Sequence, residues 1–148
     1  MGPSGHKPSF LIKPTLDTKF YIDYSWWERN AEDLRIYLLS HVLPEQRERL
    51  QESEENSVID YIDPETGEVS QVDELNLAIK LAAEDENFIN PQTSLVDSVF
   101  RVFLANGNSP LSPRALAEET NRSATTILKT FSSTRIYKGI RPYDPEET

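Results

Sequence analysis

Residues 111–143 place the tightest constraint on how this chain can fold, because they read as two short amphipathic helices joined by a sharp turn. Ser112 is a favourable N-cap and Pro113 stands at the first helical position, so the first helix has clear start signals. Asn121 tolerates the left-handed backbone of a sharp turn, and Ser123 can cap the second helix. The side chains that we expect on the facing sides of the two helices are Leu116, Ala117, Thr120, Ala124, Ile127, Leu128 and Phe131.

This order of residues resembles the helix-turn-helix of winged-helix proteins, over the last third of the chain. The resemblance is carried by Leu116 and Ala117 in the first helix, Asn121 at the turn, Ser123 at the cap, and Ile127 and Leu128 in the second helix. Glycine is commoner at the turn in that family, so Asn121 is a departure. The resemblance implies that the second helix enters the major groove of DNA and that RIYKGIR, residues 135–141, forms the wing. The residues that would then contact nucleic acid are Arg122, Ser123, Thr125, Thr126, Lys129, Arg135, Lys138 and Arg141.

The net charge of −10 argues against a nucleic-acid binder until its distribution along the chain is considered. Residues 51–94 hold twelve acidic side chains against Lys80 alone, whereas the stretch from Arg122 to Arg141 holds five basic side chains and no carboxylate. The chain is therefore bipolar, and a basic surface in its last third is compatible with DNA binding. So few positive charges predict weak binding by one copy, so useful affinity requires a homodimer or a protein partner.

The first third of the chain predicts an arm, a strand and a long helix. Residues 1–16 contain three prolines and are expected to form a flexible arm. Residues 19–23 alternate in the manner of a half-buried strand. Ser25 and Glu28 then form a capping box for a helix that runs until Pro44 ends it. The buried face of this helix is expected to hold Trp27, Ala31, Leu34 and Leu38.

Trp26 and Trp27 stand next to each other on the predicted helix, so their rings point about 100° apart. We expect one ring inside the core and the other at its rim. The ring at the rim is a candidate contact for a protein partner or a stacked ligand, and the alternative is that both rings only cover the core of a small domain.

The middle of the chain predicts an acidic β-hairpin followed by a helix. Residues 57–62 and 68–72 read as strands, and residues 63–67 suit a four-residue loop built on a type I turn, with the closing glycine at positive φ. Because a two-stranded hairpin is unstable alone, it should recruit residues 19–23 as a third strand or pack on a helix. Asp73 can cap the next helix, whose buried face would hold Leu75, Ala78, Ile79 and Ala82.

A further helix is expected to begin at Ser94 and to end at Asn106 and Gly107 with a left-handed cap, which completes a three-helix unit. Residues 44–56 are polar on all sides and favour a short solvated helix or a linker. The expected domain organisation is a flexible arm at 1–16, an N-terminal α+β region with the acidic hairpin at 17–92, a winged helix-turn-helix-like domain at 93–143, and a disordered tail at 144–148.

Catalytic and metal-binding patterns are missing from the sequence. The chain has no cysteine, and neither His6 nor His41 stands in a nucleophile-elbow or zinc-ligand spacing. The five glycines are isolated and form no phosphate loop. A calcium loop from Asp63 to Glu74 would need glycine at its sixth position, where Glu68 stands. We therefore expect no enzyme activity, no cofactor and no metal.

Nothing in the sequence points to a membrane. The chain has no apolar run near the roughly 18 residues that a spanning helix needs. The N-terminus MGPSGHKPSF lacks a hydrophobic segment of signal-peptide length, so we expect a cytoplasmic protein.

The expected fold class is α+β: an N-terminal strand, a long helix and a β-hairpin packed with a C-terminal three-helix winged helix-turn-helix unit. Two functions remain open on these grounds. The first is a small DNA-binding protein, either a regulator or the DNA-engaging subunit of a larger assembly. The second is a non-enzymatic adaptor that uses the helix-turn-helix and the Trp26 and Trp27 surface for protein contacts.

Overall fold

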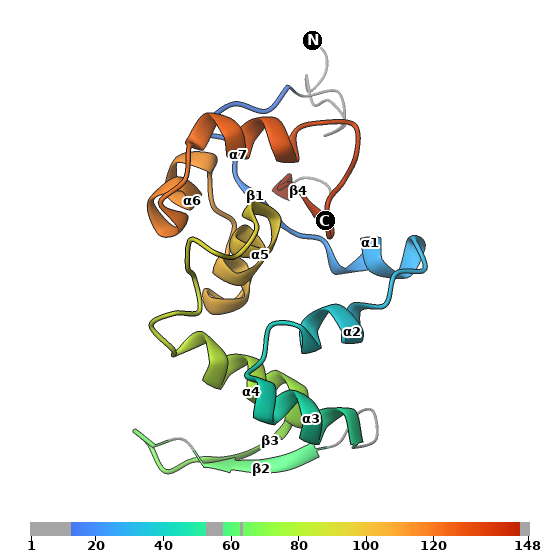
Figure 1. Ribbon diagram of the computed structural model, residues 1–148, viewed down its shortest axis with the longest axis vertical. Helices are drawn as coiled ribbons and strands as arrows, with labels where there is room; N and C mark the ends of the chain where they lie inside the picture. The colour runs from blue at the N-terminus through green and yellow to red at the C-terminus, as the bar shows by residue number, and fades with distance from the viewer. Residues whose placement is uncertain (1–12, 53–57, 63, 146–148) are drawn as a thin grey trace. The chain divides into compact units, whose positions relative to one another are not determined.

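The computed structural model has helices and two short antiparallel strand pairs, and it belongs to the α+β class. The residues that it describes are 13–52, 58–62 and 64–145. The chain divides into two compact units, the first formed by residues 1–32 and 89–148 and the second by residues 33–88 (Figure 1). The N-terminal strand thus belongs to the same unit as the C-terminal helices, whereas the sequence predicts a separate region at 17–92.

The first unit holds four helices and a short sheet. Its elements are β1 (Phe20–Ile22), α1 (Tyr24–Arg29), α5 (Leu95–Ala105), α6 (Pro113–Thr120), α7 (Ala124–Phe131) and β4 (Ile140–Pro142). Its core is apolar and is drawn from every one of these elements. The buried hydrophobic side chains are Phe20, Ile22, Trp27, Val99, Phe100, Val102, Phe103, Leu116, Ile127, Phe131 and Ile140.

Helices α5 and α6 begin and end where the local signals predict, and α7 begins where its cap predicts. The side chains of Ser94, Ser112 and Ser123 each accept a hydrogen bond from a backbone N–H of the first turn of the helix that follows. Asn121 ends α6 in the left-handed conformation, with φ of 55°. Gly107 follows α5 with φ of 72°. The predicted order of helix, sharp turn and helix between α6 and α7 is therefore confirmed.

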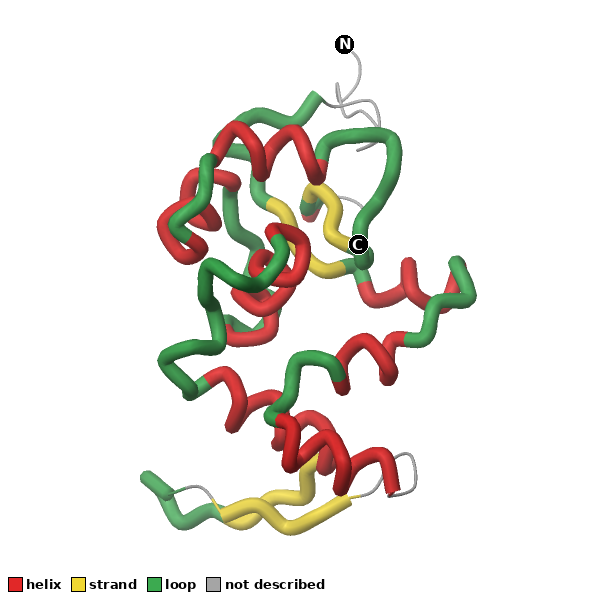
Figure 2. Tube along the Cα trace, viewed as in Figure 1, coloured by secondary structure: helices red, strands yellow, loops and turns green. Residues whose placement is uncertain are grey.

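Strand β1 lies between two segments that are far from it in sequence. On one side it pairs antiparallel with β4, with Ile22 opposite Ile140 (Figure 2). On the other side Phe20 exchanges two backbone hydrogen bonds with Leu111, of 2.8 and 3.0 Å. The side chain of Asn108 extends this second edge: its Oδ1 accepts from the N–H of Ile22 at 2.8 Å, and its Nδ2 donates to the Ile22 carbonyl at 2.9 Å.

This pairing bears on two expectations about the strands. Residues 19–23 do not join the acidic hairpin, because their hydrogen-bonding edges are taken by β4 and by the segment 108–111. Residues 135–141 do not form a wing hairpin by themselves either. Only β4, at the end of that segment, is a strand, and it pairs with β1.

The expected long helix from Ser25 to Pro44 is wrong, because the helix is interrupted at Ala31. Helix α1 ends at Arg29, and Ala31 adopts a left-handed φ of 52°. Asp33 then caps a new helix. Its Oδ1 accepts from the N–H of Ile36 at 3.0 Å, and the break coincides with the boundary between the two units.

The second unit holds α2 (Leu34–Leu39), α3 (Pro44–Glu52), β2 (Val58–Ile62), β3 (Val69–Asp73) and α4 (Glu74–Ala83). The predicted hairpin is confirmed, with Ile62 opposite Val69 and Gly67 at a φ of 74°. The predicted cap is also confirmed, since Asp73 Oδ1 accepts from the N–H of Leu75 at 3.1 Å. The predicted face of α4 is buried: Leu75, Ala78, Ile79 and Ala82.

Pro44 begins a helix rather than only ending one. Helix α3 is polar, as expected for residues 44–52, but it buries Leu50. Two arginines anchor it to α2. Arg47 donates from Nε to the Leu39 carbonyl at 2.9 Å, and Arg35 of α2 donates to the Leu50 carbonyl at 3.1 Å.

Parts of the expected arm and tail lie outside the described residues. Of the arm only residues 13–16 are described, and of the tail only residues 144–145. Within the described part of the chain, no helix has the length and apolar character needed to cross a membrane.

Candidate nucleic-acid interface

Helix α7 separates its polar side chains from its apolar ones. Ile127 and Phe131 are buried in the core of the first unit. Thr125, Thr126 and Lys129 lie on the opposite side of the helix and are exposed. This division follows from helical spacing, because residues three or four apart share a face. The outward side of α7 therefore presents two hydroxyls and one ammonium group.

Ser123 is exposed at the start of α7, but its side chain has a structural role. Its Oγ accepts a hydrogen bond from the N–H of Thr126 at 3.2 Å. Capping of this kind stabilises a helix by about 1 kcal/mol. Ser123 thus sets where α7 begins and which residues face outward.

Arg122 is used to hold the turn between α6 and α7 in place. Its Nη2 donates to the carbonyl oxygens of Pro91 and Thr93, in the segment that leads into α5. The guanidinium is half-buried by these contacts. Arg122 is therefore a structural cation that joins the start of α5 to the helical turn.

Arg141 also makes a contact within the first unit, an ion pair with Asp23. Its Nη1 lies 3.2 Å from Oδ2 of Asp23, and the two side chains are only 25% and 14% exposed. Burial acts to raise the pKa of Asp23, but hydrogen bonds from Ser25 and Arg29 and the charge of Arg29 outweigh it, so the pKa lies below its ordinary value of 3.8. Asp23 is therefore a carboxylate at neutral pH, and it ties β4 to the start of α1.

The loop between α7 and β4 carries the two remaining cations of the basic segment. Arg135 is exposed, and its Cζ lies 5.0 Å from the centroid of the Tyr137 ring. Lys138 has its Nζ 5.7 Å from the centroid of the Trp27 ring and takes a left-handed φ of 56°. Of the five basic residues from Arg122 to Arg141, Lys129 and Arg135 are thus the two that are exposed.

The two tryptophans divide as the sequence predicts. Trp27 is buried and meets Phe100 edge to face, with ring centroids 6.2 Å apart. Trp26 is half-buried and rests its ring at 89° to that of Trp27, with centroids 5.2 Å apart. The prediction of one ring inside and one at the rim is confirmed, and Trp26 is the ring that reaches the surface.

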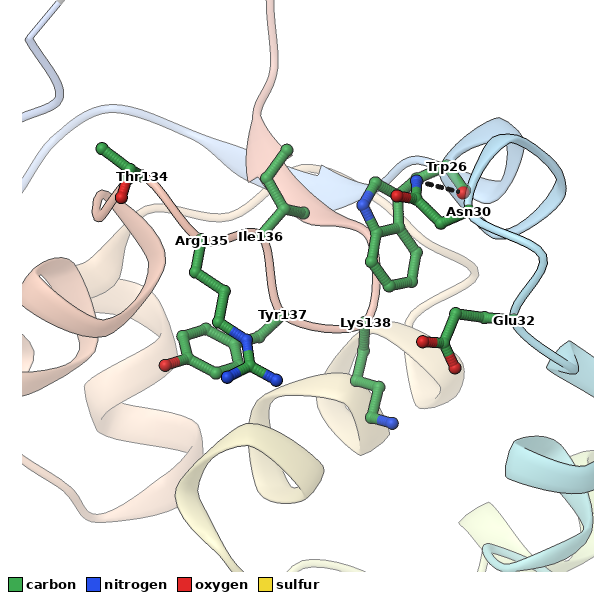
Figure 3. Close-up of a pocket in the computed structure, with 8 residues that line it drawn as sticks. All are labelled: Trp26, Asn30, Glu32, Thr134, Arg135, Ile136, Tyr137 and Lys138. Carbon is green, nitrogen blue, oxygen red and sulfur yellow. Dashed lines mark hydrogen bonds between the residues drawn. The ribbon is translucent and has the colours of Figure 1, made fainter.

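Trp26 faces a hollow of about 390 Å³ between α1 and the loop that precedes β4. Figure 3 shows Arg135 and Tyr137 on one side of this hollow, the indole of Trp26 on the other, and Lys138 and Glu32 along one edge. The full lining is Trp26, Asn30, Glu32, Thr134, Arg135, Ile136, Tyr137 and Lys138.

Five of these eight side chains are absent from the site residues that the sequence predicts: Asn30, Glu32, Thr134, Ile136 and Tyr137. The pattern places Asn30 and Glu32 in the middle of a long helix, and the helix break at Ala31 brings them to the hollow instead. Tyr137 falls within the segment that resembles a wing. The usable signal is its position between Arg135 and Lys138, since aromatic rings interleaved with cations are common where nucleic acids bind.

Metal-binding groups do not gather in the described part of the chain, where no three His, Cys, Asp or Glu side chains stand close enough to hold an ion. His41 is buried, with its ring edge to face with that of Tyr37 and the centroids 4.5 Å apart. Comparison of the chain with protein-family models, with curated proteins and with solved structures gave no significant match.

Proposed function

We propose that the first unit is a winged helix-turn-helix variant that binds duplex DNA through the outward side of α7. The observation that carries the proposal is the exposed row of Thr125, Thr126 and Lys129 on a helix whose other side is buried. No carboxylate occurs between Arg122 and Arg141, so nothing on α7 repels phosphate. In this variant β1 takes the place in the sheet that a second wing strand would otherwise fill.

The side chains divide by role. Lys129 and Arg135 contact phosphates and orient the protein, while Thr125 and Thr126 are short enough to reach base edges or thymine methyl groups. Arg122, Ser123 and Arg141 act indirectly, because their contacts with the protein hold α7 and the sheet in position. Such a small basic surface suits the DNA-engaging subunit of an assembly, or a regulator that binds as two copies.

Charge reversal on this surface tests the proposal. The double variant Lys129→Glu, Arg135→Glu should bind duplex DNA at least about ten-fold more weakly at low salt, because two phosphate contacts become repulsive. The measurement is retention on immobilised duplex, followed by elution with rising salt. Both side chains are exposed, so the variant should keep the circular dichroism spectrum and the unfolding temperature of the parent.

A matched control separates the local contact from the overall charge. Arg49→Glu with Lys80→Glu makes the same change in net charge within the second unit, where Arg49 is 65% exposed in its pair with Glu74. This control should be retained nearly as well as the parent. Equal retention of the parent and the Lys129, Arg135 variant would contradict DNA binding by α7.

That contradicting result would favour the adaptor function, for which the second unit provides a specific observation. Its hairpin places Ile62 and Val69 opposite each other, and they are 63% and 60% exposed. Residues 33–88 hold fifteen acidic side chains against four basic ones. An exposed apolar pair within an acidic unit suits a protein partner better than DNA.

A further inference from the structure

We propose that the hollow beside Trp26 is a separate binding site for one unstacked guanine nucleotide, supplied either free or by the end of a nucleic-acid strand. Its volume of about 390 Å³ lies within the roughly 300–1,000 Å³ of small-molecule sites. The hollow lies in the first unit and does not include Thr125, Thr126 or Lys129, but it shares Arg135 with the proposed duplex surface. The site goes beyond duplex binding by α7, because Trp26 and Glu32 have no part in that surface.

The wall formed by Trp26 suits the flat face of a base. Trp27 packs against Trp26 at 89° and is itself buried, so the Trp26 ring rests against a fixed neighbour. Asn30 fixes the same turn of α1, because its Nδ2 donates to the Trp26 carbonyl at 2.8 Å (Figure 3). A supported indole at the rim of a hollow is the type of surface on which nucleobases stack.

Glu32 selects guanine among the bases. A carboxylate carries only acceptors, and the Watson–Crick edge of guanine offers two adjacent donors, N1–H and the N2 amino group. Adenine offers one amino group beside the acceptor N1, and that acceptor would face the carboxylate. Glu32 is exposed at the edge of the hollow, where it can meet the rim of a base that is stacked on Trp26.

Arg135 and Lys138 supply the charge for the phosphate. The guanidinium of Arg135 lies 5.0 Å from the Tyr137 ring centroid, and this cation–π contact holds it at the hollow. Lys138 lines the same hollow. Two cations against the single carboxylate of Glu32 give the site a net attraction for a phosphate monoester.

The backbone at the hollow is held in an unfavourable conformation on both sides. Ala31 stands between Asn30 and Glu32 with φ of 52°, and Lys138 has φ of 56°. Non-glycine residues adopt this region at a cost, and such residues cluster at binding sites. Glu32, which follows Ala31, and Lys138 both line the hollow (Figure 3).

Calorimetric titration of the full chain with GMP, AMP and UMP tests the site. GMP should bind saturably and at least about ten-fold more tightly than AMP or UMP, because only guanine offers the carboxylate two adjacent donors.

Trp26→Ala should weaken GMP binding by about five- to a hundred-fold, the range found for the loss of one stacked base. Glu32→Gln should remove about ten-fold or more of the preference for GMP over AMP, because a charged acceptor becomes a neutral amide. Glu28→Gln, an exposed carboxylate of α1 outside the hollow, should change neither.

A second arm identifies the source of the nucleotide. A duplex with an unpaired, 5′-phosphorylated dG is compared with the same duplex ending in unpaired dA and with a blunt duplex. Binding of the dG end but not of GMP, lost in Trp26→Ala, supports a strand end as the source. The proposal is overturned if neither GMP nor the dG end binds. It is also overturned if all bases bind equally and Glu32→Gln does not change their binding. If the Trp26→Ala variant still retains the blunt duplex, duplex binding by α7 does not require the Trp26 side chain.

Discussion

Replacing Gly139 by alanine should lower the free energy of unfolding by about 3 kcal/mol, the largest stability loss expected from an added methyl group among the glycines that the structure describes. Gly139 has φ of 79°, and an added Cβ would lie 2.8 Å from the Asp23 carbonyl oxygen and 3.1 Å from Nε1 of Trp27. The carbonyl of Gly139 also accepts from the N–H of Asp23 at 2.8 Å. The methyl group would therefore push β4 away from the start of α1. Chemical denaturation followed by tryptophan fluorescence measures the loss.

Gly107→Ala is the matched control for this substitution. Gly107 has a similar φ of 72°, but nothing lies within 4 Å of the position that an added methyl group would take. It should cost only the left-handed backbone penalty, about 1 kcal/mol. If the two variants lost equal stability, the close approach of Gly139 to Asp23 would be refuted.

Replacing Asn108 by alanine should also cost about 3 kcal/mol, because it leaves both backbone groups of Ile22 without their partner in a part-buried place. The Asn108 amide accepts from the Ile22 N–H and donates to the Ile22 carbonyl, and so acts as one more rung of the sheet. Its φ of 63° adds to the cost, since alanine tolerates this conformation less well than asparagine.

Asn106→Ala provides the comparison for Asn108. Asn106 also makes two side-chain hydrogen bonds, both with Ser109 at 3.1 Å, but they are exposed and local. Its φ of −102° suits alanine, so the loss should be about 1 kcal/mol. Denaturation curves in which Asn108→Ala is no less stable than Asn106→Ala would show that Asn108 does not complete the sheet.

The parts of the fold that the sequence predicts correctly are those set by neighbouring residues. Caps and turns depend on contacts within about four positions, so Ser112, Asn121 and Ser123 could be read directly. The hairpin in the second unit was predictable for the same reason, because its strands are joined by a short turn that contains Gly67. Local signals therefore define α5, α6, α7 and the hairpin.

The partner of β1 could not be predicted, because the residues that pair with β1 lie far from it in the sequence. Asn108 and Ile22 are 86 residues apart, and the Arg141 pair with Asp23 joins residues 118 apart. The helix break also could not be predicted from Ala31 itself. Ala31 is a strong helix former, yet it adopts a left-handed φ between the C-cap Asn30 of α1 and the N-cap Asp33 of α2.

The candidate interface was predictable only in outline. A count of charges shows that the segment from Arg122 to Arg141 is basic, but it does not show which of these cations bind acceptors within the protein itself. Arg122 binds the carbonyl oxygens of Pro91 and Thr93, and Arg141 binds the carboxylate of Asp23. These acceptors lie far from the basic segment in the sequence. The hollow beside Trp26 was hidden for the same reason, because it is formed by two segments about 100 residues apart in the chain.

The most direct test of the central claim, that α7 meets DNA with its outward side, is the salt dependence of duplex affinity. Fluorescence anisotropy of a labelled duplex is measured for the parent and for Lys129→Gln between low and physiological salt. If Lys129 contacts one phosphate, the slope of log affinity against log salt should become shallower by about one in the variant. An unchanged slope, with the same affinity as the parent at every salt concentration, would contradict the claim.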